Sequence, residues 1–167
     1  VILWTHDVQN GVKEMLQKRF PAVPIIQTEK EIREAFDKAD FFVHGSGPSL
    51  VGRHNIAQWA KETGKPYGVY GITFPGKYIA RTEKMTASPM DVDLLNNAAF
   101  IYFRDSVSLK FAKEIGITCP VMEFGPDGTF AVDLHKDEAA MRFLKEHHLE
   151  EGKFMCCIPR YRYTEEW

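Results

Sequence analysis

Short apolar runs alternate with amphipathic segments along most of the chain, and this alternation constrains the fold more than any other feature. The apolar runs have the length of strands, and we expect strands at residues 1–5, 23–26, 41–43, 66–70, 99–103, 120–124 and 153–158. Apolar residues recur at helical spacing between them, and we expect helices at residues 12–20, after Thr28, and at 55–63, 90–97, 106–115 and 137–147. Strands and helices that alternate through short connections are typical of an α/β protein. The sequence therefore predicts a Rossmann-like parallel sheet with helices on both faces.

Local residue patterns mark several element ends. Thr28 and Glu31 have the spacing of a capping box, which starts a helix. Gly64 and Gly116 stand where two of the helices should stop, and Gly71 should end the fourth strand. Residues 73–89 mix proline, glycine and polar residues, so we expect a long loop there, and such loops are often functional.

Composition excludes several classes of function. The chain has 167 residues and a formal charge of −2, so it lacks the basic character of a nucleic-acid-binding protein. No apolar run is long enough to span a bilayer. His6 with Asp7, and His147 with His148, have no partners at metal-ligand spacing. We expect neither a metal nor a cofactor.

The cysteines and the chain ends lead to two further expectations. Cys119, Cys156 and Cys157 show neither a disulfide framework nor metal-ligand spacing. Cys156 and Cys157 stand in an apolar run, so we predict buried thiols in a reducing compartment, which favours the cytoplasm. The first strand has no leader before it, and no closing element follows the last strand. We therefore expect residues 1–167 to be a single domain, either the N-terminal domain of a longer protein or the ordered part of one.

The third apolar run ends in a glycine-rich loop, Gly45-Ser46-Gly47. Glycines let a ligand approach the main chain, and ligands of α/β proteins bind at the carboxyl ends of strands. The loop lacks the signatures of a P-loop and of a dinucleotide-binding turn, and a tight turn would explain its glycines about as well. His44 could act as a general acid or base, but we favour a hydrogen-bonded strand terminus.

Arg104 ends another strand, and Asp105 or Ser106 caps the helix that follows. A guanidinium beside a helix N-terminus can hold a phosphate or a carboxylate in bidentate fashion. The alternative is that Arg104 and Asp105 pair with each other or with a neighbouring loop.

Two later segments offer weaker candidates. Asp127 stands in Gly-Pro-Asp-Gly, which is a turn signal by itself. Arg160 belongs to a segment with two arginines and two tyrosines, which suits an anion or a sugar. A solvated segment that leads out of the domain would have the same composition.

Taken together, these segments resemble the polysaccharide pyruvyl transferase family over most of the chain. The Arg-Asp-Ser-x-Ser-Leu block is the most specific of the matching pieces. The pieces are Phe42-Val43-His44-Gly45-Ser46-Gly47, Tyr67-Gly68-Val69-Tyr70-Gly71-Ile72, Arg104-Asp105-Ser106-Val107-Ser108-Leu109 with Gly116-Ile117, Pro126-Asp127, and the strand that ends at Arg160.

The resemblance implies transfer of pyruvate from phosphoenolpyruvate to a sugar of a cell-surface polysaccharide or its precursor, with formation of a ketal and release of phosphate. It implies a two-domain architecture similar to the GT-B glycosyltransferases, with this chain as the N-terminal half. It also implies that the family's catalytic histidine lies in the second domain, so this chain alone would be inactive and its own catalytic residues are unknown. The partners would be phosphoenolpyruvate and a glycan, handled beside membrane-associated glycan machinery.

On this interpretation Arg104 binds the donor, while Gly45, Ser46 and Gly47 form the wall that faces the acceptor sugar. Asp127 and Arg160 complete the predicted substrate-binding set. Two alternatives remain open. They are a nucleotide-sugar glycosyltransferase of similar architecture and a domain that binds sugars or anions without catalysis.

Overall fold

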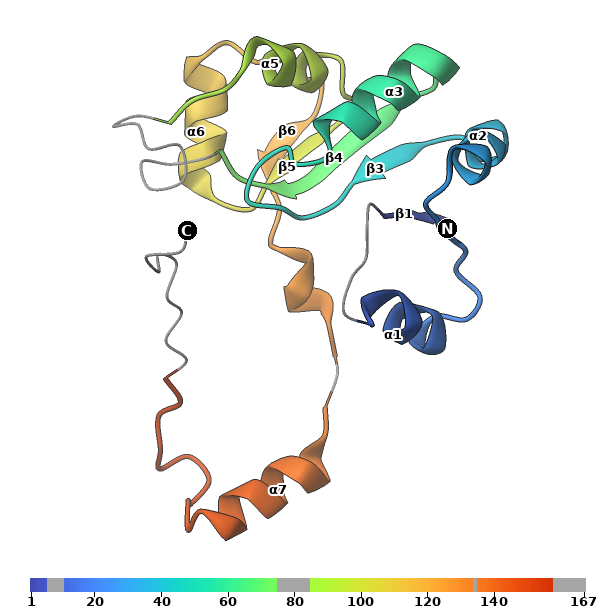
Figure 1. Ribbon diagram of the computed structural model, residues 1–167. Helices are drawn as coiled ribbons and strands as arrows, with labels where there is room; N and C mark the ends of the chain where they lie inside the picture. Colours follow the sequence, from blue (N-terminus) through green and yellow to red (C-terminus); the bar gives the residue numbers. More distant parts are fainter. Residues whose placement is uncertain (6–10, 75–84, 134, 158–167) are drawn as a thin grey trace, which may run out of the picture. The chain divides into compact units, whose positions relative to one another are not determined.

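The computed structural model describes residues 1–5, 11–74, 85–133 and 135–157 (Figure 1). The chain divides into two compact units, Val1–Phe130 and Ala131–Trp167, and each has its own description below. In the part of the chain that the structure describes, all strands belong to Val1–Phe130. The prediction of a single domain over residues 1–167 stays a prediction.

Strands and helices alternate in Val1–Phe130 in the order that the sequence predicts. The elements are β1 (Leu3–Trp4), α1 (Val12–Arg19), β2 (Ile25–Ile26), α2 (Glu29–Lys38), β3 (Phe42–His44), α3 (Arg53–Thr63), β4 (Tyr67–Ile72), α5 (Pro89–Asn96), β5 (Ile101–Phe103), α6 (Ser106–Glu114) and β6 (Met122–Phe124). A short 3₁₀ helix, Gly128–Ala131, follows β6. The α/β prediction is confirmed.

The strands form two parallel sheets, where the sequence predicted one. β3, β4, β5 and β6 make a four-stranded sheet in that order, and β1 pairs only with β2 among the described strands. β1 and β2 have two residues each, so they offer few backbone groups for further pairing. Side chains link the sheets instead: the Trp4 ring lies 5.6 Å from the Phe36 ring and 6.0 Å from the Phe42 ring, between centroids.

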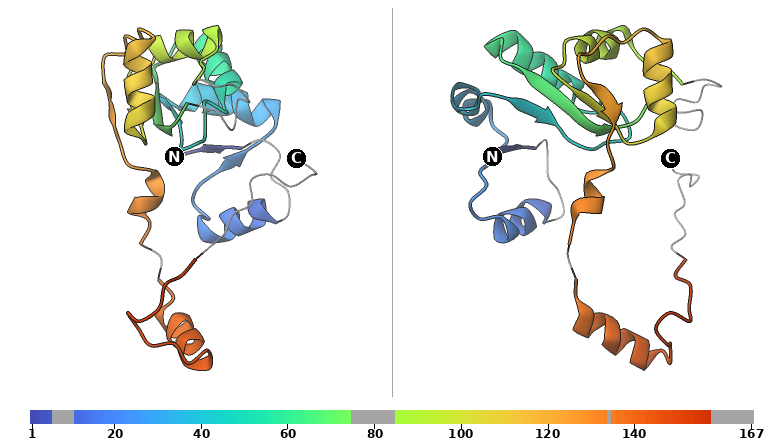
Figure 2. Two further views of the ribbon diagram at one scale, coloured as in Figure 1. Left: turned by 90° about the vertical axis from the view of Figure 1, so that its left-hand side faces the viewer. Right: turned by 180° about the vertical axis from the view of Figure 1, so that it is seen from behind.

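Helices lie on both sides of the strands, as predicted. Right-handed crossovers between strands that follow each other in one direction place α3, α5 and α6 on the same face of the four-stranded sheet. Figures 1 and 2 show these three helices together on that face, with α1 on the opposite side. None of the described helices has the length and apolar character that crossing a membrane takes.

The core lies between the four-stranded sheet and the helices that cover it. Trp59 of α3, Val69 of β4 and Phe103 of β5 are fully or almost fully buried. Tyr67 of β4 is also buried, and its hydroxyl donates a hydrogen bond of 2.7 Å to the Leu94 carbonyl of α5. Burial raises the pKa of Tyr67 to about 12. This pair fixes α5 against the sheet.

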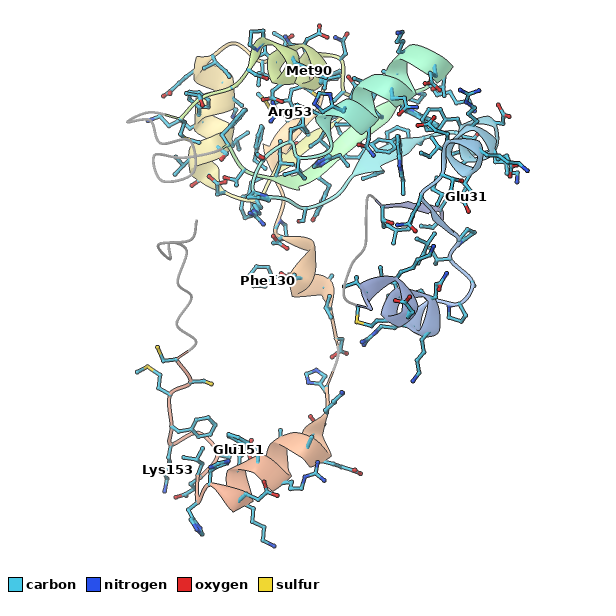
Figure 3. All side chains as sticks on the ribbon, viewed as in Figure 1. Glu31, Arg53, Met90, Phe130, Glu151 and Lys153 are labelled. Carbon is cyan, nitrogen blue, oxygen red and sulfur yellow. The ribbon has the colours of Figure 1, made fainter. Side chains whose placement is uncertain are left out.

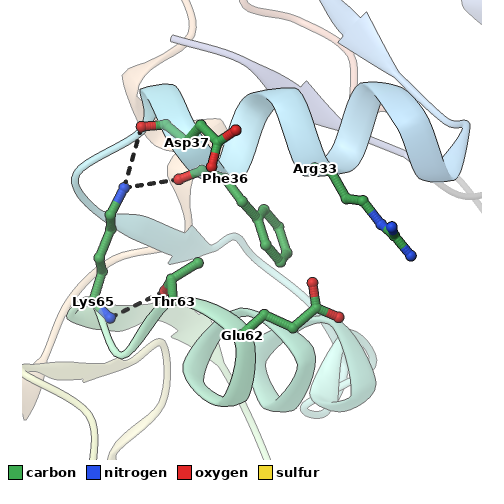
Figure 4. A pocket seen from close by; sticks show the side chains of 6 residues that line it. All are labelled: Arg33, Phe36, Asp37, Glu62, Thr63 and Lys65. Carbon is green, nitrogen blue, oxygen red and sulfur yellow. Dashed lines mark hydrogen bonds between the residues drawn. The ribbon is translucent and has the colours of Figure 1, made fainter.

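Lys65 joins the C-terminal ends of α2 and α3 (Figure 4). Its ammonium donates hydrogen bonds of 2.7 Å to the carbonyls of Phe36 and Ala39, which end α2. Those carbonyls have no partner within the helix, and the lysine ammonium supplies one. Its positive charge also interacts favourably with the negative, C-terminal end of the helix dipole. The Trp59 indole in turn donates to the Lys65 carbonyl at 3.1 Å.

The predicted helix ends are confirmed where the signal is local. Glu31 donates its backbone N–H to the Thr28 hydroxyl, and the Thr28 N–H donates to the Glu31 carboxylate at 2.9 Å. The N–H groups of Thr28 and Gln27 lower the pKa of Glu31 to about 2. Gly64 and Gly116 have φ of +64° and +80° and end their helices in the left-handed conformation that favours glycine.

The start of α5 is fixed in the same way. Ser88 and Asp91 form a capping box, so α5 begins at Pro89, one residue before the prediction. Arg53 of α3 lies beside this helix (Figure 3), and its guanidinium forms an ion pair of 3.1 Å with Asp91. Residues 75–84 of the predicted 73–89 loop lie outside the described residues.

Two predictions in the Ala131–Trp167 unit are wrong. Lys153–Cys157 form no strand, although a strand was expected at 153–158, and Ile158 lies outside the described residues. An isolated strand is not stable, and no other strand occurs in the described part of this unit. Cys156 and Cys157 are therefore exposed rather than buried, whereas Cys119, in Val1–Phe130, is buried. The unit's helix is α7 (Asp137–Glu146).

Gly68 of β4 provides a test of this packing. A Cβ at Gly68 would collide with the Phe100 ring, which itself stacks on Phe41 at 5.8 Å between centroids. We expect Gly68→Ala to lower the free energy of unfolding by about 1–3 kcal/mol in urea, because the stacked Phe100 ring must move to accept the new Cβ. Gly128→Ala is the control, since its Cβ would enter open space, and should change stability by at most about 0.5 kcal/mol. Equal midpoints for the two variants would contradict this account.

Candidate functional site

The carboxyl ends of β3 to β6 meet at one edge of the four-stranded sheet because all its strands are parallel. Backbone hydrogen bonds continue past the strand ends there. Gly47 donates to the Gly71 carbonyl, Arg104 to the Ile72 carbonyl, and Gly125 to the Phe103 carbonyl, at 3.3, 3.1 and 2.9 Å. The glycine loop and Arg104 thus flank the end of β4, two strand spacings or about 10 Å apart. Both predicted segments lie at one edge.

The glycine loop runs alongside the end of β4, where Gly47 forms an isolated parallel β-bridge with Ile72. Gly71 lies inside β4, whereas the sequence predicted that it ends the strand. It has φ of +75°, and a Cβ there would collide with the Ser46 hydroxyl. The pairing shifts between Tyr70 and Ile72, so the strand bends past this glycine and continues for another residue. Gly71 therefore makes room for the glycine loop.

The two interpretations of the loop apply to different residues. Gly47 is buried, and a Cβ there would lie 3.1 Å from the Ser49 carbonyl oxygen. Gly47 is therefore a glycine of a tight turn, where the backbone leaves little room for a side chain. Gly45 and Ser46 are exposed. They line a groove of about 780 Å³ whose walls include the side chains of Trp4, Phe42 and Val43. Of the loop, Gly45 and Ser46 are the residues that a ligand can reach.

Arg104 forms an ion pair with Asp127. Both residues were predicted for the site, and they are 23 positions apart in the sequence. Nη1 of Arg104 lies 2.6 Å from Oδ2 of Asp127. The alternative that Arg104 pairs with a neighbouring loop is therefore confirmed. Asp127 is the only side-chain partner of Arg104 among the described residues. Because a guanidinium has five N–H donors and Asp127 engages it through Nη1, Arg104 has further donors with which to hold an anion.

Asp127 is itself held in place by its turn. Its Oδ1 accepts hydrogen bonds of 3.1 Å from the backbone and hydroxyl of Thr129. The Tyr70 hydroxyl donates to the Pro126 carbonyl at 2.9 Å, which ties the turn to β4. The Thr129 N–H and the Arg104 guanidinium together lower the pKa of Asp127 to about 2. The carboxylate is thus charged at every physiological pH.

Sequence reasoning missed a polar cluster behind Arg104. Asp105 caps α6 by accepting the Ser108 N–H at 2.7 Å, as predicted. The fully buried Ser108 hydroxyl accepts the Phe74 N–H at 2.9 Å and bonds to the Thr73 hydroxyl at 2.8 Å. Burial acts to raise the pKa of Asp105, but hydrogen bonds from Thr73 and Ser108 outweigh it and leave the pKa lowered. The cluster joins the end of β4 to the start of α6, and only the Asp-x-x-Ser spacing signalled it.

The structure describes His44 but not Arg160, the two remaining residues that the sequence singled out. His44 is a hydrogen-bonded strand terminus, as favoured: its Nε2 accepts the Gly52 N–H at 3.0 Å. Arg160 lies outside the described residues and stays a prediction. The described residues contain no group of three or more His, Cys, Asp or Glu side chains that could hold a metal ion.

The carboxyl group of Asp127 provides a direct test of this geometry. Because its pKa is lowered in the folded protein, the pair stabilises the fold above the carboxyl group's usual pKa of 3.8, and this contribution is lost as the pH falls through about 2. We expect a carboxyl ¹³C NMR titration to show a midpoint near pH 2. In Arg104→Ala the midpoint should move upward. A wild-type midpoint near 4 would contradict the ion pair.

Comparison with known proteins adds the family to this geometry. A family model described as polysaccharide pyruvyl transferase matches residues 10–165. No curated protein and no solved structure matches the chain. The match includes the glycine loop, Arg104 and Asp127, which the fold gathers at one sheet edge. The chain belongs to the polysaccharide pyruvyl transferase family.

Proposed function

We propose that this protein transfers pyruvate from phosphoenolpyruvate to a sugar of a cell-surface polysaccharide or its precursor, forms a ketal and releases phosphate. The observation that carries the proposal is the family match over residues 10–165, since that family transfers pyruvyl groups to polysaccharides. The position of Arg104 in the structure also supports the proposal, because it lies at the carboxyl edge of the sheet beside the start of α6.

The reaction makes clear demands on a site. Protonation of the enol methylene carbon turns C2 of phosphoenolpyruvate into an oxocarbenium-like electrophile. One sugar hydroxyl attacks C2 and loses its proton, the C2–O bond to phosphate breaks, and a second hydroxyl closes the ketal with loss of its proton. The site must therefore bind a phosphate and a carboxylate with cationic groups and supply an acid-base residue.

Arg104 meets the first demand in this proposal. Its guanidinium binds the phosphate or the carboxylate of the donor, close to the positive N-terminal end of the α6 dipole. Asp127 keeps the guanidinium in one orientation, so fewer side-chain conformations are lost when the anion binds. Gly45 and Ser46 form the accessible wall for the acceptor sugar. The acid-base residue is not assigned.

The architecture completes the proposal. We place this chain as the N-terminal half of a GT-B-like protein, with the catalytic histidine in a second domain and with activity only in the two-domain protein. The protein would act in the cytoplasm, beside the membrane-associated machinery that assembles glycans.

Removal of Arg104 tests the donor site. Phosphate release from phosphoenolpyruvate should be measured with candidate glycans in the protein that contains this chain. We expect Arg104→Ala to lower kcat/KM about ten- to hundredfold, because a hydrogen bond to a charged group contributes about 1.5–3 kcal/mol. Lys110→Ala is the matched control. It also removes one positive charge, at an exposed site of α6 where Lys110 pairs with Glu114.

The same assay separates the alternatives. Unchanged turnover in Arg104→Ala would remove this residue from the donor site. Turnover with a nucleotide sugar and none with phosphoenolpyruvate would establish the glycosyltransferase. Binding of sugars or anions without turnover of either donor would establish a domain that has no catalytic activity.

A further inference from the structure

His44 stands at the junction between β3 and the loop that reaches α3. Its side chain is 6% exposed, and its Nε2 accepts the backbone N–H of Gly52 at 3.0 Å. His44 and Gly52 are eight positions apart, and the segment between them contains the glycine loop with the accessible Gly45 and Ser46. One side chain thus ties together the two ends of the segment that forms the proposed acceptor wall.

Glycines leave space for the imidazole. A Cβ at Gly52 would lie 2.9 Å from Cδ2 and 3.2 Å from Nε2 of His44, closer than side chains approach each other. A Cβ at Gly47 would lie 3.9 Å from Cε1, in ordinary contact. The ring therefore fills a space that Gly52 leaves open, and the glycine at position 52 and the histidine at position 44 depend on each other.

The contact does for α3 what a capping box does for α2 and α5, with a different side chain. At α2 the N–H of the N-cap residue Thr28 bonds to Glu31, and at α5 the N–H of Ser88 bonds to Asp91. The N-cap residue of α3 is Gly52, which has no side chain to accept a hydrogen bond. His44 accepts the Gly52 N–H from the end of the preceding strand, so the cap of α3 also fixes the loop.

The ring is in the right state for this role. Because Nε2 accepts a hydrogen bond, the proton of the neutral ring lies on Nδ1. Burial lowers the pKa of His44, and the nearby carbonyls of Gly45 and His44 offset only part of that effect. Nδ1 has no hydrogen-bond partner of good geometry in the described part of the chain. The accepting nitrogen therefore stays unprotonated near neutral pH.

We propose that His44 is a positioning residue: by holding Gly52 it fixes the 45–52 loop and so places Gly45 and Ser46 for the acceptor sugar. The positioning of the loop stands on the contacts above, while its consequence for the acceptor rests on the proposed function. His44 itself does not need to touch the reacting atoms.

Two substitutions separate the hydrogen bond from simple loss of the ring. The side-chain oxygen of Gln lies as many bonds from Cβ as Nε2 does, whereas that of Asn reaches only as far as Nδ1. We expect the Gly52 amide of His44→Asn to exchange with solvent about five- to thirtyfold faster, the usual effect of a lost cap, and His44→Gln to restore most of the protection. Lys61→Ala is the control, since Lys61 is exposed in the last turn of α3, and it should leave the exchange of the Gly52 amide unchanged. Equal exchange in the Asn and Gln variants would overturn the proposal.

A double-mutant cycle checks the same contact without relying on one variant. Gly52→Ala should speed exchange in the wild type because its Cβ displaces the ring, and should have little further effect in His44→Ala, where the space is empty. Additive effects would overturn the proposal.

The catalytic readout is separate. In His44→Asn, KM for the glycan should rise while kcat changes little, because Arg104 is untouched. An unchanged KM with faster loop exchange would overturn the role toward the acceptor and leave the loop contact established. Absence of pyruvyl transfer in the wild type would refute the proposed function and leave the exchange result intact.

Discussion

The carboxyl end of β4 is the part of the structure on which the site depends. Gly71 adopts φ of +75° there, and the strand pairing shifts by one residue. This bend lets Gly47 pair on one side and lets Arg104 donate to Ile72 on the other. With a side chain at position 71, the Ser46 hydroxyl would have no space. The two segments that the site needs are therefore held by the backbone of one strand.

Around this strand end, the residues of the candidate site are held in place by contacts with their neighbours. Asp127 orients Arg104, and Thr129 with the Pro126–Tyr70 hydrogen bond holds Asp127. His44 holds the glycine loop while it caps α3. Such support by neighbouring groups reduces the conformational freedom that a ligand must remove, and that is the physical basis of preorganised binding.

Local signals made part of this structure predictable from sequence. The order of strands and helices, the Thr28 capping box and the stop at Gly64 depend on residues within one turn of each other, so the sequence displays them directly. The pairing of Arg104 with Asp127, the division into two sheets and the Ser108 cluster depend on contacts between distant segments. Cys156 and Cys157 show the same limit, because their apolar run looks like a strand but has no partner strand in the described part of its unit.

The central claim is that one edge of the sheet brings a donor anion at Arg104 next to an acceptor sugar at Gly45 and Ser46. A crystal structure of the protein that contains this chain, with phosphoenolpyruvate bound, tests it most directly. We predict a phosphate or carboxylate oxygen within hydrogen-bond distance of the Arg104 guanidinium, with Asp127 still on its other side. Phosphoenolpyruvate bound elsewhere, with Arg104 in contact only with Asp127, would contradict the account.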